Sequence, residues 1–349
     1  MALRFGINGL GRVGRALLRI AWNRPEIELV AVNDVVPAHV LARLLARDTV
    51  HGPFHPGGGR PVGPAGPVQE ILAEDACLRV GGRNIRFYQE PDPARIAWED
   101  DGLDVVVEAT GRFLRRDQAA AHLRGPVRHA VISANADPGD PADYTVCLGI
   151  NEDGLDPSCQ AVISNASCTT NCLALVAKVL HDGFGVRRAL MNTVHSYTEN
   201  QRLLDLPHPD ARRSRAAALN MIPTSTTAAR ALGLLIPGLA GRVDGFAVRV
   251  PTPGVAMLDL VAEVETETHA EAVRQAFREA AGQRMQGVLA VTEEELVSSD
   301  FIGDSHSAVV DLPLVQVLEG GMVRVVAWYD NEWGYATRLA DLLVRLSSA

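Results

Sequence analysis

The feature that most constrains the fold of this chain is a glycine pattern near its N-terminus. A short apolar run, Leu3 to Ile7, leads into Gly9, Gly11 and Gly14 with the spacing G-x-G-x-x-G, and an apolar run at helical spacing follows. In a strand–turn–helix unit, Gly9 permits the tight turn, Gly11 lets a pyrophosphate approach the backbone, and Gly14 lets the helix pack close to the strand. Free N–H groups and the positive dipole end at the helix N-terminus favour bound phosphates. The pattern predicts a dinucleotide site.

An acidic residue stands where such a site needs one. A second apolar run, Ile27 to Val32, ends at Asn33-Asp34, and Asp34 lies twenty-five residues after Gly9. Its carboxylate is expected to accept hydrogen bonds from both ribose hydroxyls and to repel a 2′-phosphate, which favours NAD over NADP. A glycine turn that serves packing alone is the alternative, and it does not explain the acid.

Two later apolar runs predict further strands of a parallel sheet. One spans Val105 to Glu108 and the other His129 to Ile132. Ligands bind beyond the carboxyl ends of such strands, so the residues that follow, Thr110, Gly111 and Ser133, are candidate cofactor contacts. Ordinary turn residues at strand ends account for the same pattern equally well.

The pattern changes after Asn165, which predicts a second domain of α+β type. Longer strands are expected at Arg187–His195, Asp244–Val250, Leu258–Glu265 and Met322–Trp328, and helices at Thr170–His181, Thr226–Leu235, Ala270–Ala281 and Glu332–Leu346. The predicted fold class is α/β, a Rossmann-type dinucleotide-binding domain with an α+β catalytic domain that holds a mixed or antiparallel sheet. We expect the first domain to span residues 1–167, joined by the C-terminal helix 332–349, and the catalytic domain residues 168–331. The Gly/Pro-rich stretch His55–Pro67 predicts an exposed, mobile loop.

Composition excludes several classes of protein. Of 349 residues, 33 are Lys or Arg and 42 are Asp or Glu, and the net charge of −9 disfavours a broad nucleic-acid surface. With 47% hydrophobic and 21% charged residues the chain is typical of soluble globular proteins, and no apolar run approaches the roughly 20 residues of a membrane span. Five cysteines, an odd number, argue against a disulfide framework and show no metal-site spacing. The glycine cluster comes too early for a secretory signal peptide. We expect a cytoplasmic protein without a metal.

A cysteine and a histidine are the candidate catalytic residues. Cys168 follows Ser167 at the start of an apolar helical run, and Ser is a frequent helix N-cap. The helix dipole is expected to lower the pKa of the Cys168 thiol. His195 ends a predicted strand, and a histidine close to the thiol in space would activate it. A packed cysteine and a structural histidine explain the same positions equally simply.

Cationic and hydroxyl side chains suggest an anionic substrate. Arg212, Arg213 and Arg215 form a basic cluster in an acidic chain, which is either a phosphate clamp or a solvated charge run. Arg249 alternates with Phe246, Val248 and Val250, so it points to the opposite face of its strand. Together with the hydroxyls of residues 224–227, these cations suit a substrate with more than one anionic group.

At this point the chain resembles the phosphorylating glyceraldehyde-3-phosphate dehydrogenase family along nearly its whole length. The motifs that carry the resemblance are INGLGRVGR at residues 7–15, SNASCTTNC at 164–172, HSYT at 195–198, RRSRAA at 212–217 and WYDNEWGY at 328–335. The cysteine and tryptophan motifs are specific to this family and its close relatives.

The resemblance implies a role for individual residues. Cys168 attacks the aldehyde and His195 is the general base; after hydride transfer to NAD, inorganic phosphate cleaves the thioester. The cofactor contacts are implied at Gly9, Gly11, Arg12, Val13, Asp34, Thr110, Gly111, Ser133, Asn331 and Tyr335. One phosphate site is implied at Thr198 and Arg213 and the other at Ser167, Thr169, Thr226 and Thr227, with Arg249 between the two. The family is usually a homotetramer, and Leu206-Pro207 is similar to its NAD-preferring loop.

Some positions depart from the family pattern. Thr227 stands where the family usually has glycine, Gly254 follows Pro253 where asparagine is usual, and Pro91 replaces an arginine near the adenine. Thr227 is expected to weaken or reshape one phosphate site.

Two alternative functions remain: erythrose-4-phosphate dehydrogenase, which hydrolyses its thioester with water, and a catalytically quiet NAD-binding paralogue.

Overall fold

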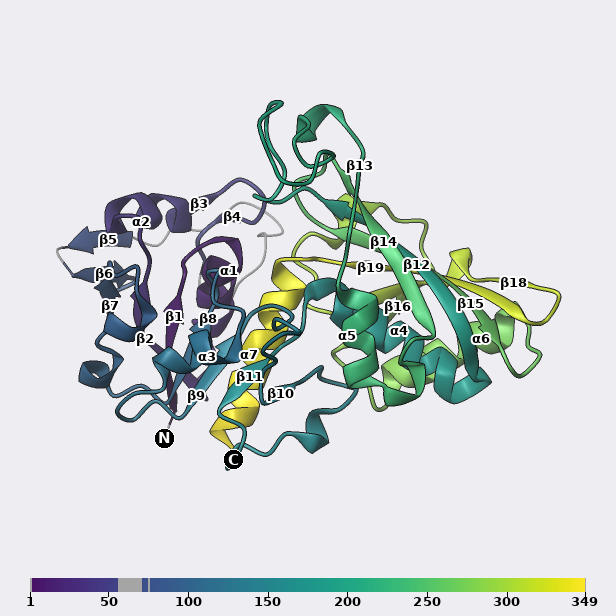
Figure 1. Ribbon diagram of the computed structural model, residues 1–349, viewed down its shortest axis with the longest axis horizontal. Helices are drawn as coiled ribbons and strands as arrows, with labels where there is room; N and C mark the ends of the chain where they lie inside the picture. The colour runs from purple at the N-terminus through teal and green to yellow at the C-terminus, as the bar shows by residue number, and fades with distance from the viewer. Residues whose placement is uncertain (1, 56–70, 75, 349) are drawn as a thin grey trace. The chain divides into compact units, whose positions relative to one another are not determined.

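A computed structural model describes residues 2–55, 71–74 and 76–348. The chain divides into two compact units. The first unit comprises Met1–Val146, Glu152–Ala166 and Ala336–Ala349, and the second comprises Cys147–Asn151 and Ser167–Tyr335. Figure 1 shows the elements of each unit. The predicted loop at His55–Pro67 lies outside the described residues from position 56 onward.

The first unit is built on a nine-stranded sheet with the order β10-β11-β9-β8-β1-β2-β7-β6-β5, counted over the described residues. Its strands are β1 (Leu3–Asn8), β2 (Ile27–Asn33), β5 (Ile71–Glu74), β6 (Cys77–Val80), β7 (Arg83–Tyr88), β8 (Val105–Glu108), β9 (His129–Ile132), β10 (Tyr144–Thr145) and β11 (Val162–Ser164). The strands from β10 to β7 pair in parallel. The last two, β6 and β5, pair antiparallel, and this edge was not predicted.

Three helices of this unit lie between strands along the chain, and the last helix follows the final strand of the described residues. They are α1 (Arg12–Ala21), α2 (Ala38–Ala46), α3 (Arg116–Ala119) and most of α7 (Trp333–Ser347), and a two-stranded ribbon joins β3 (Arg47–Asp48) to β4 (Gly52–Pro53). Single 3-10 turns lie at Pro93–Arg95, Trp98–Asp101, Ala120–His122 and Glu152–Gly154. Strands β8 and β9 are buried at every position, which explains their continuous apolar sequences. The predicted strands at 3–7, 27–32, 105–108 and 129–132 are confirmed.

The second unit contains an eight-stranded mixed sheet with the order β13-β14-β12-β15-β19-β17-β16, and β18 pairs with β19. Its strands are β12 (Val186–Ser196), β13 (Ile222–Thr224), β14 (Val243–Val250), β15 (Ala256–Val264), β16 (Leu289–Thr292), β17 (Ala308–Asp311), β18 (Gln316–Leu318) and β19 (Met322–Tyr329). Its helices are α4 (Cys168–Phe184), α5 (Ala228–Leu235) and α6 (Ala270–Gly282), with 3-10 turns at Ala217–Leu219, Pro237–Leu239, Ser298–Phe301 and Leu312–Leu314. The predicted mixed sheet is confirmed, and the predicted helices and strands agree with these bounds to within three residues.

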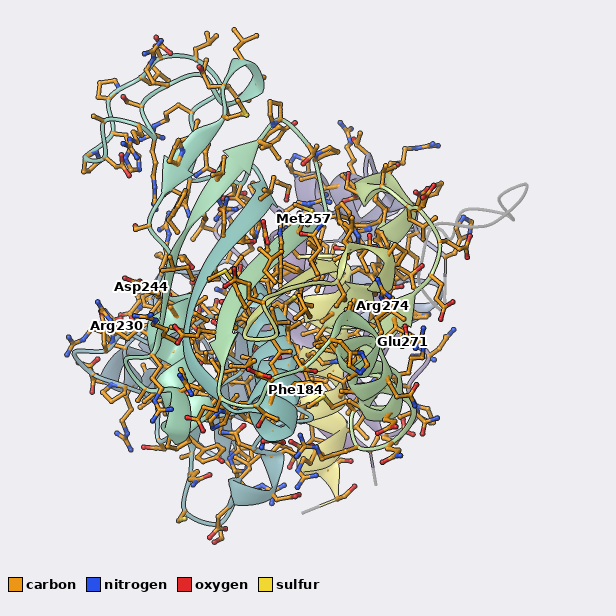
Figure 2. The ribbon with its side chains drawn as sticks, turned by 90° about the vertical axis from the view of Figure 1, so that its right-hand side faces the viewer. Phe184, Arg230, Asp244, Met257, Glu271 and Arg274 are labelled. Atoms are coloured by element: carbon orange, nitrogen blue, oxygen red, sulfur yellow. The ribbon has the colours of Figure 1, made fainter. Side chains whose placement is uncertain are left out.

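The two faces of this sheet have different surroundings. Strand β15 alternates between buried and half-buried residues along its whole length. Its buried side chains, such as Leu258 and Leu260, belong to a core that also includes the apolar residues of α4. Helix α4 contacts β12, β15 and β19; Figure 2 labels its last residue, Phe184, and Met257 on the half-buried side of β15. One face of the sheet is therefore covered by α4. Among the described residues, no helix has the length and apolar character needed to cross a membrane.

Candidate active site

Strand register places three functional side chains on one rung of the second unit's sheet. His195 of β12 pairs with Arg249 of β14 and with Ala256 of β15, and Ala256 pairs with Tyr329 of β19. Residues on one rung point to the same face. His195 is 4% exposed and its ring meets the Tyr329 ring edge-on at a centroid distance of 6.0 Å. The alternation predicted for Arg249 is confirmed, because Arg249 faces His195 while Phe246 is exposed.

The candidate nucleophile begins helix α4. Ser167 is the N-cap, and its Oγ accepts a hydrogen bond from the backbone N–H of Thr170 at 3.1 Å. Cys168 is the first helical residue, as predicted. Its Sγ lies 3.7 Å from Nε2 of His195, within hydrogen-bond range for sulfur. The fold therefore brings the two candidate catalytic side chains into direct contact.

The electrostatic environment of the Cys168 thiol differs from the expectation. Burial raises its pKa above the ordinary value, and the nearby Arg249 charge and hydrogen bonds from Thr169 compensate only in part. The prediction of a lowered thiol pKa is wrong because desolvation of the thiolate outweighs the Arg249 charge and the hydrogen bonds at the start of α4. A raised thiol pKa favours activation by transfer of the thiol proton to a base, and His195 is the base in contact with Cys168.

The imidazole of His195 is held through its other nitrogen. Nδ1 lies 2.8 Å from the Ser196 carbonyl oxygen and 2.6 Å from Nη1 of Arg249, which also donates to that carbonyl at 2.9 Å. When Nδ1–H donates to the carbonyl, Nε2 is an unprotonated base facing the thiol; when Arg249 donates to Nδ1, Nε2–H faces the sulfur. Burial, followed by the Arg249 charge, lowers the pKa of His195 to about 3. The imidazole is therefore neutral near pH 7.

Two residues of this site, Tyr329 and Thr193, were not predicted as site residues from the sequence. The Tyr329 hydroxyl contacts the hydroxyls of Thr169 at 2.8 Å and Thr193 at 2.7 Å, and all three residues are buried. Thr193 lies two positions before His195, so strand alternation could have placed it on the same face. The contact between Tyr329 and Thr193 depends on the pairing of β12, β15 and β19, and no pattern in neighbouring residues of the sequence indicates it.

Basic and hydroxyl residues lie near the rung. Arg213 donates from Nε to the Thr224 hydroxyl at 2.7 Å and pairs with Asp210 at 3.4 Å. Its charge lowers the pKa of Arg249, although burial of Arg249 is the larger cause, so the two cations lie close enough to interact. A surface hollow that includes the Arg213 partners Asp210 and Thr224 is lined by Asp210, Ala211, Arg212, Pro223, Thr224, Ser225 and Phe246.

The hydroxyl residues implied by the resemblance are distributed around helix starts and turns. Thr198 donates its backbone N–H to Oε1 of Gln201 at 2.8 Å. The Thr226 hydroxyl accepts from the Ala228 N–H at 3.2 Å, at the start of α5. Thr227 is the N-cap residue with φ of −95° and ψ of 0°, a conformation open to any L-residue. The threonine therefore replaces glycine without backbone strain.

The glycines of the first unit suit a bound dinucleotide. Gly9 has φ of +97°, and a Cβ there would lie 2.7 Å from the Thr110 nitrogen. A Cβ on Gly14 would lie 2.2 Å from the Gly9 carbonyl oxygen, whereas a Cβ on Gly11 would meet nothing within 4 Å. Gly9 and Gly14 are thus required by the turn itself, and Gly11 leaves open space above the start of α1. This geometry fits the predicted roles of the three glycines and a pyrophosphate at the helix N-terminus.

The other predicted cofactor residues lie at strand ends and loops. Asp34 accepts from the Leu10 N–H at 2.8 Å and the Val36 N–H at 2.9 Å. Arg12 forms an ion pair with Asp48. Ser133 donates its N–H to the Glu108 carbonyl at 2.9 Å, and Gly111 has φ of +69°. In the second unit, Oδ1 of Asn331 accepts from the Ser196 hydroxyl at 3.0 Å, and Tyr335 is buried. Val13 lies in the first turn of α1.

Comparison with known proteins identifies the relatives of this chain. The family described as glyceraldehyde 3-phosphate dehydrogenase, NAD binding domain, matches residues 3–116, and its C-terminal domain matches residues 167–331. Glyceraldehyde-3-phosphate dehydrogenase 1 of Bacillus subtilis (strain 168) is 48% identical over 342 residues, covering 98% of this chain and 97% of the relative. Glyceraldehyde-3-phosphate dehydrogenase of Geobacillus stearothermophilus is 48% identical over 348 residues, covering 100% and 99%. Glyceraldehyde-3-phosphate dehydrogenase 2 of Streptomyces arenae is 45% identical over 350 residues, covering 100% of both chains.

Proposed function

Because this chain belongs to the glyceraldehyde 3-phosphate dehydrogenase family, we propose that Cys168 and His195 are the catalytic pair of its reaction. The protein is an oxidoreductase that uses NAD to oxidise glyceraldehyde 3-phosphate, with inorganic phosphate as the second substrate. The observation that carries the assignment of the pair is the 3.7 Å contact between Cys168 Sγ and His195 Nε2. The relatives give no support to the alternatives, erythrose-4-phosphate dehydrogenase or a catalytically quiet paralogue.

The proposed chemistry begins with the two side chains in contact. His195 Nε2 takes the thiol proton, and the Cys168 thiolate attacks the aldehyde carbon to form a thiohemiacetal. The backbone N–H of Cys168 and the His195 imidazole stabilise the oxygen as it becomes negative. Bound NAD supplies the hydride acceptor for the oxidation. The resulting Cys168 thioester is cleaved by phosphate, which forms the acyl phosphate 1,3-bisphosphoglycerate and restores the thiol.

Arg249 can control which nitrogen of His195 carries the proton during the proposed reaction. We propose that a substrate phosphate competes for the Arg249 guanidinium, which is in contact with Nδ1 of His195. Once Arg249 turns to the anion, Nδ1–H donates to the Ser196 carbonyl and Nε2 is left as the unprotonated base. Substrate binding would thereby prepare the base that it needs.

The proposed anion sites follow the resemblance. Thr198 and Arg213 would hold one phosphate, and Arg249 would lie between the two phosphates, where its cationic side chain suits an anionic substrate. Ser167, Thr169, Thr226 and Thr227 would serve the other, and the position of Thr227 at the start of α5 supports it. We propose NAD contacts at Gly9, Gly11, Arg12, Val13, Asp34, Thr110, Gly111, Ser133, Asn331 and Tyr335.

The catalytic assignment is tested by NADH formation from glyceraldehyde 3-phosphate, with and without phosphate. Cys168→Ser is expected to abolish turnover while NADH still binds, and His195→Asn to slow turnover by roughly 10²–10⁴-fold. Cys159→Ser, which removes an exposed thiol, is the control and should match the wild type. Loss of less than tenfold in His195→Asn would reject the base. Phosphate-independent turnover of erythrose 4-phosphate in preference to the triose would reject the substrate.

We also propose that the protein is a homotetramer. The face of the second unit's sheet that α4 does not cover carries Leu190, 68% exposed, and Phe246, 48% exposed. Nearby segments add the exposed Leu203, Leu204, Leu206, Leu219 and Met221. An apolar surface of this kind is typical of an interface, and a second copy of the chain is the proposed occupant. Phe246→Glu should lower the mass measured by sedimentation equilibrium, whereas an unchanged mass would exclude this face.

Because the catalytic thiol must remain reduced, we propose a cytoplasmic location.

A further inference from the structure

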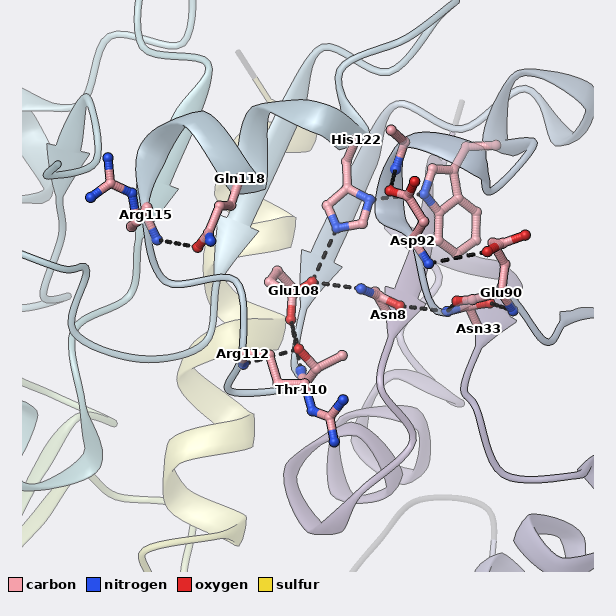
Figure 3. Close-up of polar contacts among 12 residues, drawn as sticks. Asn8, Asn33, Glu90, Asp92, Glu108, Thr110, Arg112, Arg115, Gln118 and His122 are labelled. Carbon is pink, nitrogen blue, oxygen red and sulfur yellow. Dashed lines mark hydrogen bonds and ion pairs between the residues drawn. The ribbon is translucent and has the colours of Figure 1, made fainter. Parts of the chain in front are cut away.

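The last residues of three neighbouring strands form a buried polar chain in the first unit. Asn33 of β2, Asn8 of β1 and Glu108 of β8 lie on one rung, because Asn8 pairs in register with both of the others. They are 3%, 2% and 1% exposed, so water does not satisfy their polar groups. Figure 3 shows their side chains in a continuous series of hydrogen bonds. None of the three has a role in the chemistry described above.

Glu108 is surrounded by donors only. Its Oε1 accepts the backbone N–H of Thr110 at 2.8 Å and the Thr110 hydroxyl, and its Oε2 accepts Nδ2 of Asn8 at 2.6 Å. Nε2 of His122 lies 3.1 Å from Oε2. The indole N–H of Trp98 contacts Nδ1 of His122 at 3.1 Å and can only donate, so the histidine proton is on Nε2. With four donors around it, Glu108 is an ionised, acceptor-only carboxylate.

The Glu108 carboxylate at one end and the Glu90 N–H at the other orient both amides between them. Asn8 must turn its NH₂ group to Glu108, so its Oδ1 faces Asn33, which donates from Nδ2 at 2.7 Å. Asn33 then presents Oδ1 to the backbone N–H of Glu90 at 2.9 Å, while its Nδ2 also reaches the Glu90 carbonyl at 2.9 Å. The order of donors and acceptors is therefore fixed at both ends of the chain, by the Glu108 carboxylate and by the Glu90 N–H.

Each member of the chain leads directly into a proposed cofactor contact. Asn8 precedes Gly9, Asn33 precedes Asp34, and Glu108 holds Thr110 through two hydrogen bonds. The backbone ties the same segments together, since Gly9 N–H donates to the Asn33 carbonyl at 2.8 Å and Ala109 N–H to the Asn8 carbonyl at 2.7 Å. A change in the hydrogen bonds among these side chains is therefore expected to shift the three cofactor-binding turns relative to one another.

We propose that Glu108 is a positioning residue for the dinucleotide: its buried carboxylate, acting through Asn8, Asn33 and Thr110, holds the three strand-end turns in the arrangement that binds NAD. The proposal rests on the cofactor contacts assigned under the proposed function. Glu108 itself does not touch the reacting atoms, which belong to Cys168 and His195 of the second unit.

Glu108→Gln tests the role of the charge at nearly constant volume. A glutamine that keeps its oxygen toward Thr110 N–H directs its NH₂ at Asn8 and His122, which are donors. Asn8 and Asn33 can invert their amides only by losing the bond from Glu90 N–H, and His122 cannot invert because Trp98 fixes its tautomer. We expect the Kd for NADH and the KM for NAD to rise roughly tenfold, with kcat within about twofold of the wild type.

Stability and binding are separated by a matched control. Asp311→Asn alters another buried carboxylate that accepts a tryptophan N–H, from Trp328 at 3.0 Å, in the second unit. Both variants are expected to lower the melting temperature, but only Glu108→Gln should weaken NADH binding, measured by nicotinamide fluorescence at 25 °C. If Glu108→Gln does not fold, Asn8→Ala interrupts the same chain and is expected to raise the NADH Kd with little change in kcat.

An NADH Kd and KM for NAD that stay within twofold of the wild type in Glu108→Gln would overturn the proposal. The proposal would also be overturned if Asp311→Asn lost as much melting temperature as Glu108→Gln and its NADH Kd rose equally. The weaker binding would then be a result of general destabilisation. A wild-type protein that binds NADH but does not oxidise glyceraldehyde 3-phosphate would reject the proposed catalytic pair and leave the binding comparison valid.

Discussion

Nη1 of Arg249 lies 2.6 Å from Nδ1 of His195, on neighbouring parallel strands and at the same rung of the sheet. A permanent cation in contact with the general base disfavours its protonated form, and burial acts in the same direction. The site therefore holds a neutral imidazole against the Cys168 thiol. The same arginine is the proposed phosphate ligand, so substrate recognition and the protonation of the base depend on one side chain.

Removal of the Arg249 charge should raise the pKa of His195. We expect Arg249→Gln to raise it by roughly one unit while burial keeps it below 6.5, as followed by NMR titration of the imidazole. Arg213→Gln is the control, because no interaction of Arg213 with His195 contributes to the histidine pKa. An unchanged His195 titration in Arg249→Gln would show that burial alone sets the pKa.

The lowered pKa of His195 predicts a loss of stability in mild acid. Its value is about 3 in the folded protein and about 6.5 in the unfolded chain. Between these values the unfolded state binds the proton and the folded state does not, so the free energy of unfolding falls as the pH falls below 6.5. From pH 7 to pH 5, urea unfolding of the wild type should lose about 2 kcal/mol more than that of His195→Asn. Equal losses in the two proteins would contradict the neutral, buried histidine.

Alkylation should distinguish activation by His195 from an intrinsically acidic thiol. Because burial raises the pKa of Cys168, we expect His195→Asn to slow its reaction with iodoacetamide at pH 7 by roughly tenfold or more. Peptide mass spectrometry follows Cys168 and the exposed Cys159 in the same sample, and Cys159 should react at the same rate in both proteins. Equal rates at Cys168 would mean that the helix N-terminus and Arg249 suffice.

Two glycines of the same turn should respond differently to alanine. Gly14→Ala places a Cβ 2.2 Å from the Gly9 carbonyl oxygen, so it should distort the turn and lower the melting temperature. Gly11→Ala meets no atom within 4 Å, so the free protein should keep its stability while NADH binding weakens, because the methyl group occupies the space left for the pyrophosphate. Calorimetry and NADH titration check both variants. Unchanged NADH binding in Gly11→Ala would place the pyrophosphate elsewhere.

Asp34 should decide the choice between NAD and NADP. Its carboxylate is held by the backbone N–H groups of Leu10 and Val36 just beyond the end of β2. Asp34→Gly is expected to relax discrimination against NADP in kcat/KM, because the repulsion of a 2′-phosphate is removed. Asp156→Asn, which removes an exposed carboxylate that also accepts a backbone N–H, from Ser158 at 3.0 Å, is a control for loss of a surface charge. If the selectivity of Asp34→Gly is unchanged, the Leu206-Pro207 segment determines it instead.

Much of the fold could be predicted because its signals are local. The strand–turn–helix at residues 3–21 has its glycine spacing within one short segment, and Ser167 marks the start of α4 as an N-cap. Period-two alternation placed Arg249 on the face opposite Phe246. The antiparallel edge of β5 and β6 was missed because both strands are short, four residues each, and their pairing direction depends on β7.

The amino-acid sequence by itself determined the family, the NAD-binding turn, many of the longer helices and strands, and the identity of the thiol and the imidazole, because each depends on residues close together in the chain. Only the tertiary structure decided that Cys168 and His195 lie 3.7 Å apart, that Tyr329 joins Thr169 to Thr193, and that Glu108 orients Asn8 and Asn33. It also reversed the expected pKa shift of Cys168. The physical reason is that strand register and burial are set by contacts between distant segments, and the free energy of a charge depends on all the groups that surround it in space.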